Sequence, residues 1–94
     1  MLIECVLILD GVDESCAQAL ARSCISVQQF DSLPKDRLTN LIQDYDAVVV
    51  RSSTKITKDI IDAGKRLKVI ARAGSGLDNI DIEAAEARQI VVIK

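Results

Sequence analysis

The feature that most constrains the fold is an alternation, repeated along the whole chain, of short β-forming apolar runs with longer amphipathic stretches. Parallel strands need a crossover of a dozen or more residues between them, so strands separated by helices of this length form a parallel sheet. The crossovers are right-handed and place helices on the faces of that sheet. We expect strands over residues 3–9, 25–30, 47–50, 67–71 and 90–93.

The amphipathic stretches between these strands carry apolar residues at the spacing of a helix face. A side-chain oxygen at the start of a helix accepts hydrogen bonds from its free amides, and a proline is tolerated in the first turn. The expected helices run from Asp13 to about Ser23, from Pro34 to Tyr45, from a cap at Thr57 through Gly64, and from a cap at Asp81 to about Arg88. Basic residues are expected on the solvated side of the third helix and around its end: Lys55, Lys58, Lys65, Arg66 and Lys68.

The strand at 25–30 alternates polar and apolar residues, which suits the edge of a sheet. Together with the number of strands, this favours a flavodoxin-like α/β sandwich of three layers, with strand order 2-1-3-4-5, over a closed barrel. A chain of 94 residues provides one modest core and therefore one domain, residues 1–94. Ligands of such sheets bind beyond the carboxyl ends of the strands, so we expect the functional residues just after Leu9, Val50 and Ala71.

Composition excludes several classes of function. The net charge is −2 and aromatic residues make up 2% of the chain, so no basic stripe interleaved with aromatics is present to bind nucleic acid. No apolar run approaches the roughly 20 residues that cross a bilayer, and residues 1–9 do not resemble a secretion signal. The sequence has no histidine, which removes the commonest general base and metal ligand.

The three cysteines, Cys5, Cys16 and Cys24, lack the spacing of a metal site. We expect them to be reduced, mostly buried side chains of a cytoplasmic protein. Cys16 and Cys24 are expected with Leu20 on one side of the first helix, because the three residues are four apart.

Two neighbouring strands of the predicted sheet are each followed by an arginine and small residues: Arg51-Ser52-Ser53-Thr54, and Arg72-Ala73-Gly74-Ser75-Gly76. A guanidinium matches the geometry of carboxylate or phosphate, and glycine-rich turns can offer consecutive amides to an anion. The two segments therefore predict one anion-binding pocket. The residues alone leave open that each arginine makes a surface ion pair and that the glycines form an ordinary turn.

The Gly74-x-Gly76 spacing does not predict a dinucleotide site. Asn79 stands where that motif needs its third glycine, and the next predicted helix starts too late. We expect no nicotinamide site within these residues.

The runs VVVRSSTKIT (48–57) and LKVIARAGSGLDNIDIEAA (67–85) resemble the substrate domain of the NAD-dependent D-2-hydroxyacid dehydrogenases. The resemblance implies that residues 1–94 form the N-terminal part of a substrate-binding domain. It also implies that NAD is bound by a separate Rossmann domain that carries the acid–base residues. The chain alone is then inactive, its ligand is a small anionic 2-hydroxy acid, and the complete enzyme is a homo-oligomer without a nucleic-acid or membrane partner.

The same resemblance implies roles for individual residues. Arg51 and Arg72 would hold a phosphate or carboxylate, and the amides of Ser75 and Gly76, beside Gly74, would hold the carboxylate next to the reacting carbon. Ser52 would be a weaker contact. Two arginines suit a doubly anionic, phosphorylated acid.

Outside the pocket, Asn79 is expected to hold the loop and Asp81 to cap the last helix. Gln89 stands where the family often has a left-handed glycine, which costs roughly 1 kcal/mol if that geometry is kept.

Two other functions remain open at this point. A signalling receiver module shares the predicted topology, but it requires a phosphoacceptor aspartate at the end of the third strand, where Arg51 stands. A structural or dimerisation domain without a ligand is the second alternative.

Overall fold

The computed structural model describes residues 2–73 and 78–93. Helices and strands alternate along these residues as predicted. Their bounds are β1 (Cys5–Ile8), α1 (Glu14–Arg22), β2 (Ser26–Gln29), α2 (Lys35–Leu41), a 3₁₀ turn η1 (Ile42–Asp44), β3 (Ala47–Val50), α3 (Lys58–Ala63), β4 (Val69–Arg72), α4 (Ile82–Ala87) and β5 (Val91–Ile93). Over the described residues the strands form one five-stranded parallel sheet in the order β2-β1-β3-β4-β5, which confirms the flavodoxin-like prediction.

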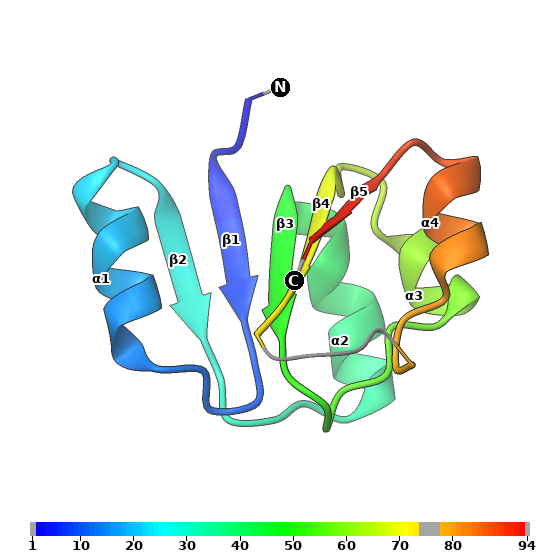
Figure 1. Ribbon diagram of the computed structural model, residues 1–94, viewed down its shortest axis with the longest axis horizontal. Coiled ribbons are helices and arrows are strands. Elements are labelled where there is room, and N and C mark those ends of the chain that lie inside the picture. Colours follow the sequence, from blue (N-terminus) through cyan, green and yellow to red (C-terminus); the bar gives the residue numbers. More distant parts are fainter. Residues whose placement is uncertain (1, 74–77, 94) are drawn as a thin grey trace.

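The sheet lies between two helical layers (Figure 1). On one face, Leu7, Val48 and Ile70 pack into a core completed by α2, α3 and α4. On the other face, Val6 and Ile8 pack against α1. The central strands β1 and β3 are thus covered on both sides, which explains why their sequences are apolar at nearly every position. The carboxyl ends of all the strands meet at the same edge of the sheet (Figure 1).

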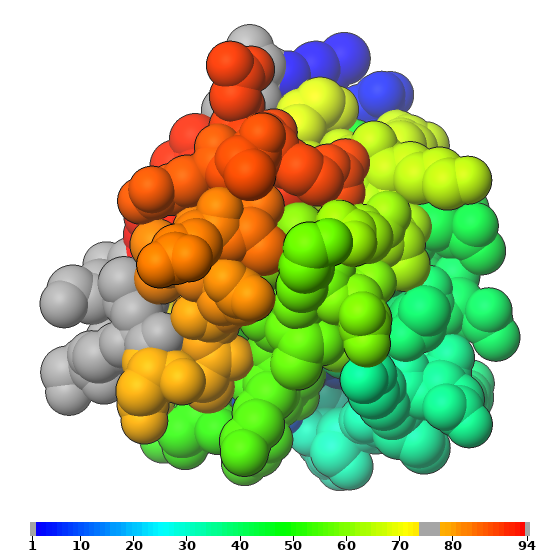
Figure 2. All heavy atoms as spheres, turned by 90° about the vertical axis from the view of Figure 1, so that its right-hand side faces the viewer, coloured from blue at the N-terminus to red at the C-terminus, as the bar shows by residue number. Residues whose placement is uncertain are grey.

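The three-helix layer forms a continuous outer surface, with α4, α3 and α2 side by side (Figure 2). At the sheet margins burial decreases. In β2 only Val27 is half-buried, and the other three residues are exposed. β2 lies at the edge of the sheet, as predicted. At the opposite edge, Val91 and Ile93 of β5 are 43% and 51% exposed.

The helix starts follow the predicted caps with one difference. The carboxylate of Asp13 accepts a hydrogen bond from the Ser15 amide at 2.8 Å, and that of Asp81 accepts one from the Ala84 amide at 3.0 Å. The Ser15 hydrogen bond lowers the pKa of Asp13. Thr57 does occupy the N-cap position of α3, but its buried Oγ1 makes no hydrogen bond within the described part of the chain.

Two helix ends use left-handed residues other than glycine. Gln89 has φ 59°, with its amide donating to Glu86 and the next amide, of Ile90, donating to Ala85. The left-handed geometry expected at Gln89 is therefore present, in the 6→1 and 5→2 pattern of a Schellman motif. Cys24 has φ 62° and ends α1 in the same way.

The prediction of mostly buried cysteines was wrong, because none of the three is fully buried. Cys24 lies beyond the end of α1 and is exposed, because the helix stops at Arg22 and the chain turns through the left-handed residue. Cys5 and Cys16 are half-buried, and all three thiols are free.

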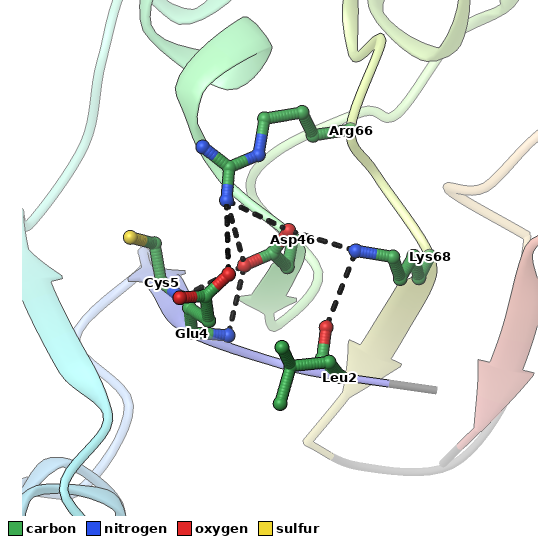
Figure 3. Close-up of polar contacts among 6 residues, drawn as sticks. All are labelled: Leu2, Glu4, Cys5, Asp46, Arg66 and Lys68. Carbon is green, nitrogen blue, oxygen red and sulfur yellow. Dashed lines mark hydrogen bonds and ion pairs between the residues drawn. The ribbon is translucent and has the colours of Figure 1, made fainter.

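The amino end of the sheet is held by one buried carboxylate, that of Asp46, which is 0% exposed. Its Oδ2 accepts hydrogen bonds from the amides of Glu4 at 2.8 Å and Cys5 at 3.0 Å. Its Oδ1 lies 3.0 Å from Lys68 Nζ and 3.3 Å from a guanidinium nitrogen of Arg66 (Figure 3). Asp46 thereby joins the starts of β1, β3 and β4.

Burial alone would raise the pKa of Asp46, but the Glu4 amide, Lys68 and the Cys5 amide outweigh it and lower the pKa to about 2. Arg66 and Lys68 therefore do not simply line the solvated end of α3, as the sequence pattern indicated. Their basic groups reach back across the start of the sheet to the buried carboxylate (Figure 3).

Among residues 2–73 and 78–93, no helix combines the length and apolar character needed to cross a membrane. The same residues bring together no group of three potential metal-ligating side chains among histidine, cysteine, aspartate and glutamate.

Candidate functional site

The two predicted arginines lie at the carboxyl ends of neighbouring strands. Arg51 is the first residue after β3, whereas Arg72 is the last residue of β4 and pairs with Val50. The predicted strand ended at Ala71, one residue too early. The ladder continues because the amide of Ala73 still donates to the carbonyl of Val50, at 2.8 Å. Both arginines therefore start from the same rim of the sheet.

The environments of the two arginines differ. Arg51 is exposed, while Arg72 is only 9% exposed. Arg72 Nε donates to Oδ1 of Asn79 at 2.8 Å, which orients its side chain. The strand pattern could not reveal this difference, because it depends on which side chains the returning segment 78–81 brings to the rim.

Asn79 joins the two arginine segments. Its Nδ2 donates to the carbonyls of Arg51 and Thr54, both at 2.7 Å, while its Oδ1 accepts from Arg72. Its own carbonyl accepts from the Ile56 amide at 2.8 Å, next to an isolated parallel bridge between Ile56 and Ile80. Asn79 holds the loop, as expected, and one amide side chain contacts both predicted anion-binding segments.

Asp10 holds the same loop from the other side. Its Oδ2 accepts from the amides of Arg51 at 2.9 Å and Thr54 at 3.0 Å, and its Oδ1 accepts from the Thr54 hydroxyl at 2.5 Å. Asp10 itself is left-handed, with φ 65°, and is followed by left-handed Gly11. Asp10 was not among the predicted binding residues. Its position directly after the first strand, at the ligand edge, was the signal that could have found it.

The resulting rim can bind an anion by charge and hydrogen bonding. It presents the exposed side chains of Arg51, Ser52 and Ser53 on a segment whose backbone is held at both ends. The predicted residues Gly74, Ser75 and Gly76 lie outside the described residues. The chain has no histidine, and the carboxylate of Asp46 lies at the opposite end of the sheet.

Two hollows flank this rim. The larger, about 340 Å³, opens between the start of α2 and the segment before α3, and its lining includes Asp10, Leu33, Lys35, Ser53 and Lys55 (Figure 2). The second, about 270 Å³, lies between residues 55–57 and 78–81. Neither Arg51 nor Arg72 lines these two hollows, so the hollows adjoin the candidate anion site without forming it.

Comparison with known proteins adds the family to this geometry. Residues 6–94 match the family model for the D-isomer specific 2-hydroxyacid dehydrogenase, catalytic domain. This chain belongs to that family. The match includes both arginine segments and Asn79, as well as the strands that position them.

Named relatives and a solved structure support the assignment. The chain is 42% identical over 88 residues to a pig (Sus scrofa) D-3-phosphoglycerate dehydrogenase, and 46% identical over 84 residues to a Thermotoga maritima hydroxypyruvate reductase. These alignments cover 94% and 89% of this chain but only 16% and 28% of the relatives. An NAD⁺-bound 3-phosphoglycerate dehydrogenase structure from Entamoeba histolytica has a TM-score of 0.84 and 34% identity, covering 97% of this chain and 32% of the other.

The starts of α1 and α4 do not fit the pyrophosphate of a dinucleotide cofactor. A dinucleotide pyrophosphate binds the free amides of a helix that opens from a glycine-rich loop. Here the carboxylates of Asp13 and Asp81 already accept hydrogen bonds from the first turns of α1 and α4. The first turns of these two helices are therefore already capped by carboxylates of this chain.

Proposed function

We propose that this chain is the substrate-binding portion of a D-3-phosphoglycerate dehydrogenase, an enzyme that oxidises 3-phosphoglycerate with NAD in serine biosynthesis. The observation that supports this most directly is the meeting of Arg51 and Arg72 at one rim, joined through Asn79. Two guanidinium groups on adjacent strand ends suit a ligand that carries two anionic groups, and 3-phosphoglycerate carries a phosphate and a carboxylate.

The proposed binding residues have different tasks. Arg51 is exposed and contacts the incoming anion, with Ser52 as an additional hydroxyl donor. Arg72 is held by Asn79 and provides a fixed guanidinium at the base of the site. Gly74, Ser75 and Gly76 supply main-chain amides to the carboxylate beside the reacting carbon. NAD and the acid–base residues belong to a further domain of the complete enzyme, which is homo-oligomeric, so this chain alone binds substrate without converting it.

Titration followed by amide NMR spectra of the 94-residue chain tests this proposal. We expect 3-phosphoglycerate to bind with a dissociation constant on the order of 1 mM, about 4 kcal/mol, which a few charge-assisted hydrogen bonds at a solvent-exposed rim can supply. D-glycerate, which lacks the phosphate, should bind about tenfold more weakly. Arg51→Ala should abolish measurable binding, whereas Arg37→Ala, which removes an exposed arginine of α2, should leave it unchanged.

The outcomes separate the possible failures. Equal affinity for D-glycerate and 3-phosphoglycerate would contradict the phosphorylated substrate and favour an unphosphorylated hydroxy acid. Absence of binding by a folded sample would contradict a substrate-binding role of this chain.

A further inference from the structure

Among residues 2–73 and 78–93, the side-chain hydrogen bonds of Asp10 all lie on the arginine segment after β3. Within the described residues its carboxylate accepts three hydrogen bonds, from the Arg51 amide, the Thr54 amide and the Thr54 hydroxyl. These residues are 41 and 44 positions away in sequence. We propose that Asp10 is a positioning residue, which sets the conformation of the Arg51–Thr54 turn and thereby its affinity for the anion. The inference rests on the proposed function, because it concerns the same site.

The backbone of Asp10 supports a positioning role. Its φ of 65° lies in the left-handed region, which few residues other than glycine adopt without cost. The carbonyl of Asp31 accepts from the Asp10 amide at 2.9 Å, so the main chain of Asp10 is held as well as its side chain.

The contacts also explain why the turn needs an outside partner. Residues 51–55 lie between β3 and the isolated bridge at Ile56, outside any helix or strand. Asp10 accepts from two amides of this segment, and Asn79 donates to its carbonyls at Arg51 and Thr54. The turn is therefore held by one acceptor and one donor on opposite sides. The amide hydrogen bond at Arg51 lies directly on the residue whose guanidinium is proposed to hold the anion.

Electrostatics alone predicts the opposite effect, which makes the inference testable. A carboxylate near an anion site repels the anion, so a purely electrostatic role means that removing the charge tightens binding. A positioning role means that removing the acceptors weakens binding. Asp10→Asn separates the two, since its carbonyl oxygen can accept from both amides while its NH₂ donates to the Thr54 hydroxyl oxygen.

The test is titration of the 94-residue chain and its variants with 3-phosphoglycerate, with circular dichroism to verify folding. Asp10→Gly removes the carboxylate while allowing φ 65° without strain, so it tests the acceptors rather than the backbone. We expect Asp10→Gly to weaken binding at least about tenfold, and Asp10→Asn to restore it to within about twofold of the wild type. Asp36→Asn, an equal change of charge at an exposed acid in the first turn of α2, should have no effect.

A second measurement, made without ligand, covers the case of a poorly folded Asp10→Gly chain. Thr54→Val removes only the hydroxyl contact, and amide hydrogen exchange at Arg51 and Thr54 reports how firmly the turn is held. Faster exchange at these two amides in the variants, with unchanged exchange in β1 and β4, supports the inference.

The results discriminate the inference from the function on which it rests. If the wild type binds and Asp10→Gly binds equally well, the positioning role is wrong while the proposed function stands. If Asp10→Asn and Asp10→Gly both tighten binding, the role of Asp10 is electrostatic and the inference is wrong. If the folded wild type does not bind, the proposed function is wrong and the inference falls with it.

Discussion

Replacing the buried carboxylate of Asp46 by a carboxamide, Asp46→Asn, should destabilise the fold far more than the same change at an exposed aspartate. The side chain is 0% exposed and accepts hydrogen bonds from two amides and from Lys68. These donors lower its pKa from 3.8 to about 2. Each pKa unit corresponds to about 1.4 kcal/mol, so the charged form contributes about 2 kcal/mol to the free energy of unfolding.

The sign of the pH dependence follows from the direction of the shift. Because the pKa of Asp46 is lower in the folded protein than in the unfolded chain, its contribution is fully present above about pH 5. It is lost as the pH falls through 3.8 towards about 2. The difference in stability between the wild type and Asp46→Asn should therefore be largest at pH 7 and fall to about a third of that value at pH 2.5.

Urea denaturation followed by circular dichroism measures these differences, with Asp59→Asn as the matched control. Asp59 forms an ion pair with Lys35 at 3.2 Å, with side chains 75% and 58% exposed. Such exposed pairs contribute about 0–1 kcal/mol. The reasoning is refuted if Asp46→Asn costs no more than Asp59→Asn at pH 7, or if its cost is the same at pH 7 and pH 2.5.

Other substitutions test the helix ends. Gln89→Gly should stabilise the fold by about 1 kcal/mol, because glycine adopts φ 59° without strain. Cys24→Gly should have a similar effect, since Cys24 has φ 62°. Thermal unfolding measures both variants, and a lower midpoint than that of the wild type would contradict the prediction. Gly64→Ala should destabilise by about 1–2 kcal/mol, since a Cβ there would lie 3.0 Å from Leu67 Cβ in a packed core. The exposed thiol of Cys24 should react with an alkylating reagent before those of Cys5 and Cys16, as mass spectrometry of partly modified protein would show.

Much of the architecture followed from local pattern. Apolar runs such as Ala47–Val50 and the spacing of helical residues around Leu38 depend on short-range periodicity, which a sequence displays directly. The caps at Asp13 and Asp81 were predictable for the same reason, since each contacts an amide two or three residues away. The positions of Arg51 and Arg72 at one rim followed from strand order.

Contacts between distant segments were not predictable in the same way. Asp46 falls between the predicted helix ending at Tyr45 and the predicted strand at 47–50, and local pattern does not show that it joins residues 4 and 68 around one buried carboxylate. Cys24 was placed on a helix face, because the spacing of four continues past a helix end that only hydrogen bonding defines.

By itself, the sequence determined the fold class, the strand order and the two arginine segments, because periodicity and turn residues act over a few positions. Only the tertiary structure decided how those segments are held. The carboxylate of Asp10 and the amide of Asn79 reach the turn after β3 from segments 41 and 28 residues away from Arg51. Such contacts depend on which distant side chains the fold places beside the turn and on how those side chains are oriented. Local sequence pattern does not determine either of these.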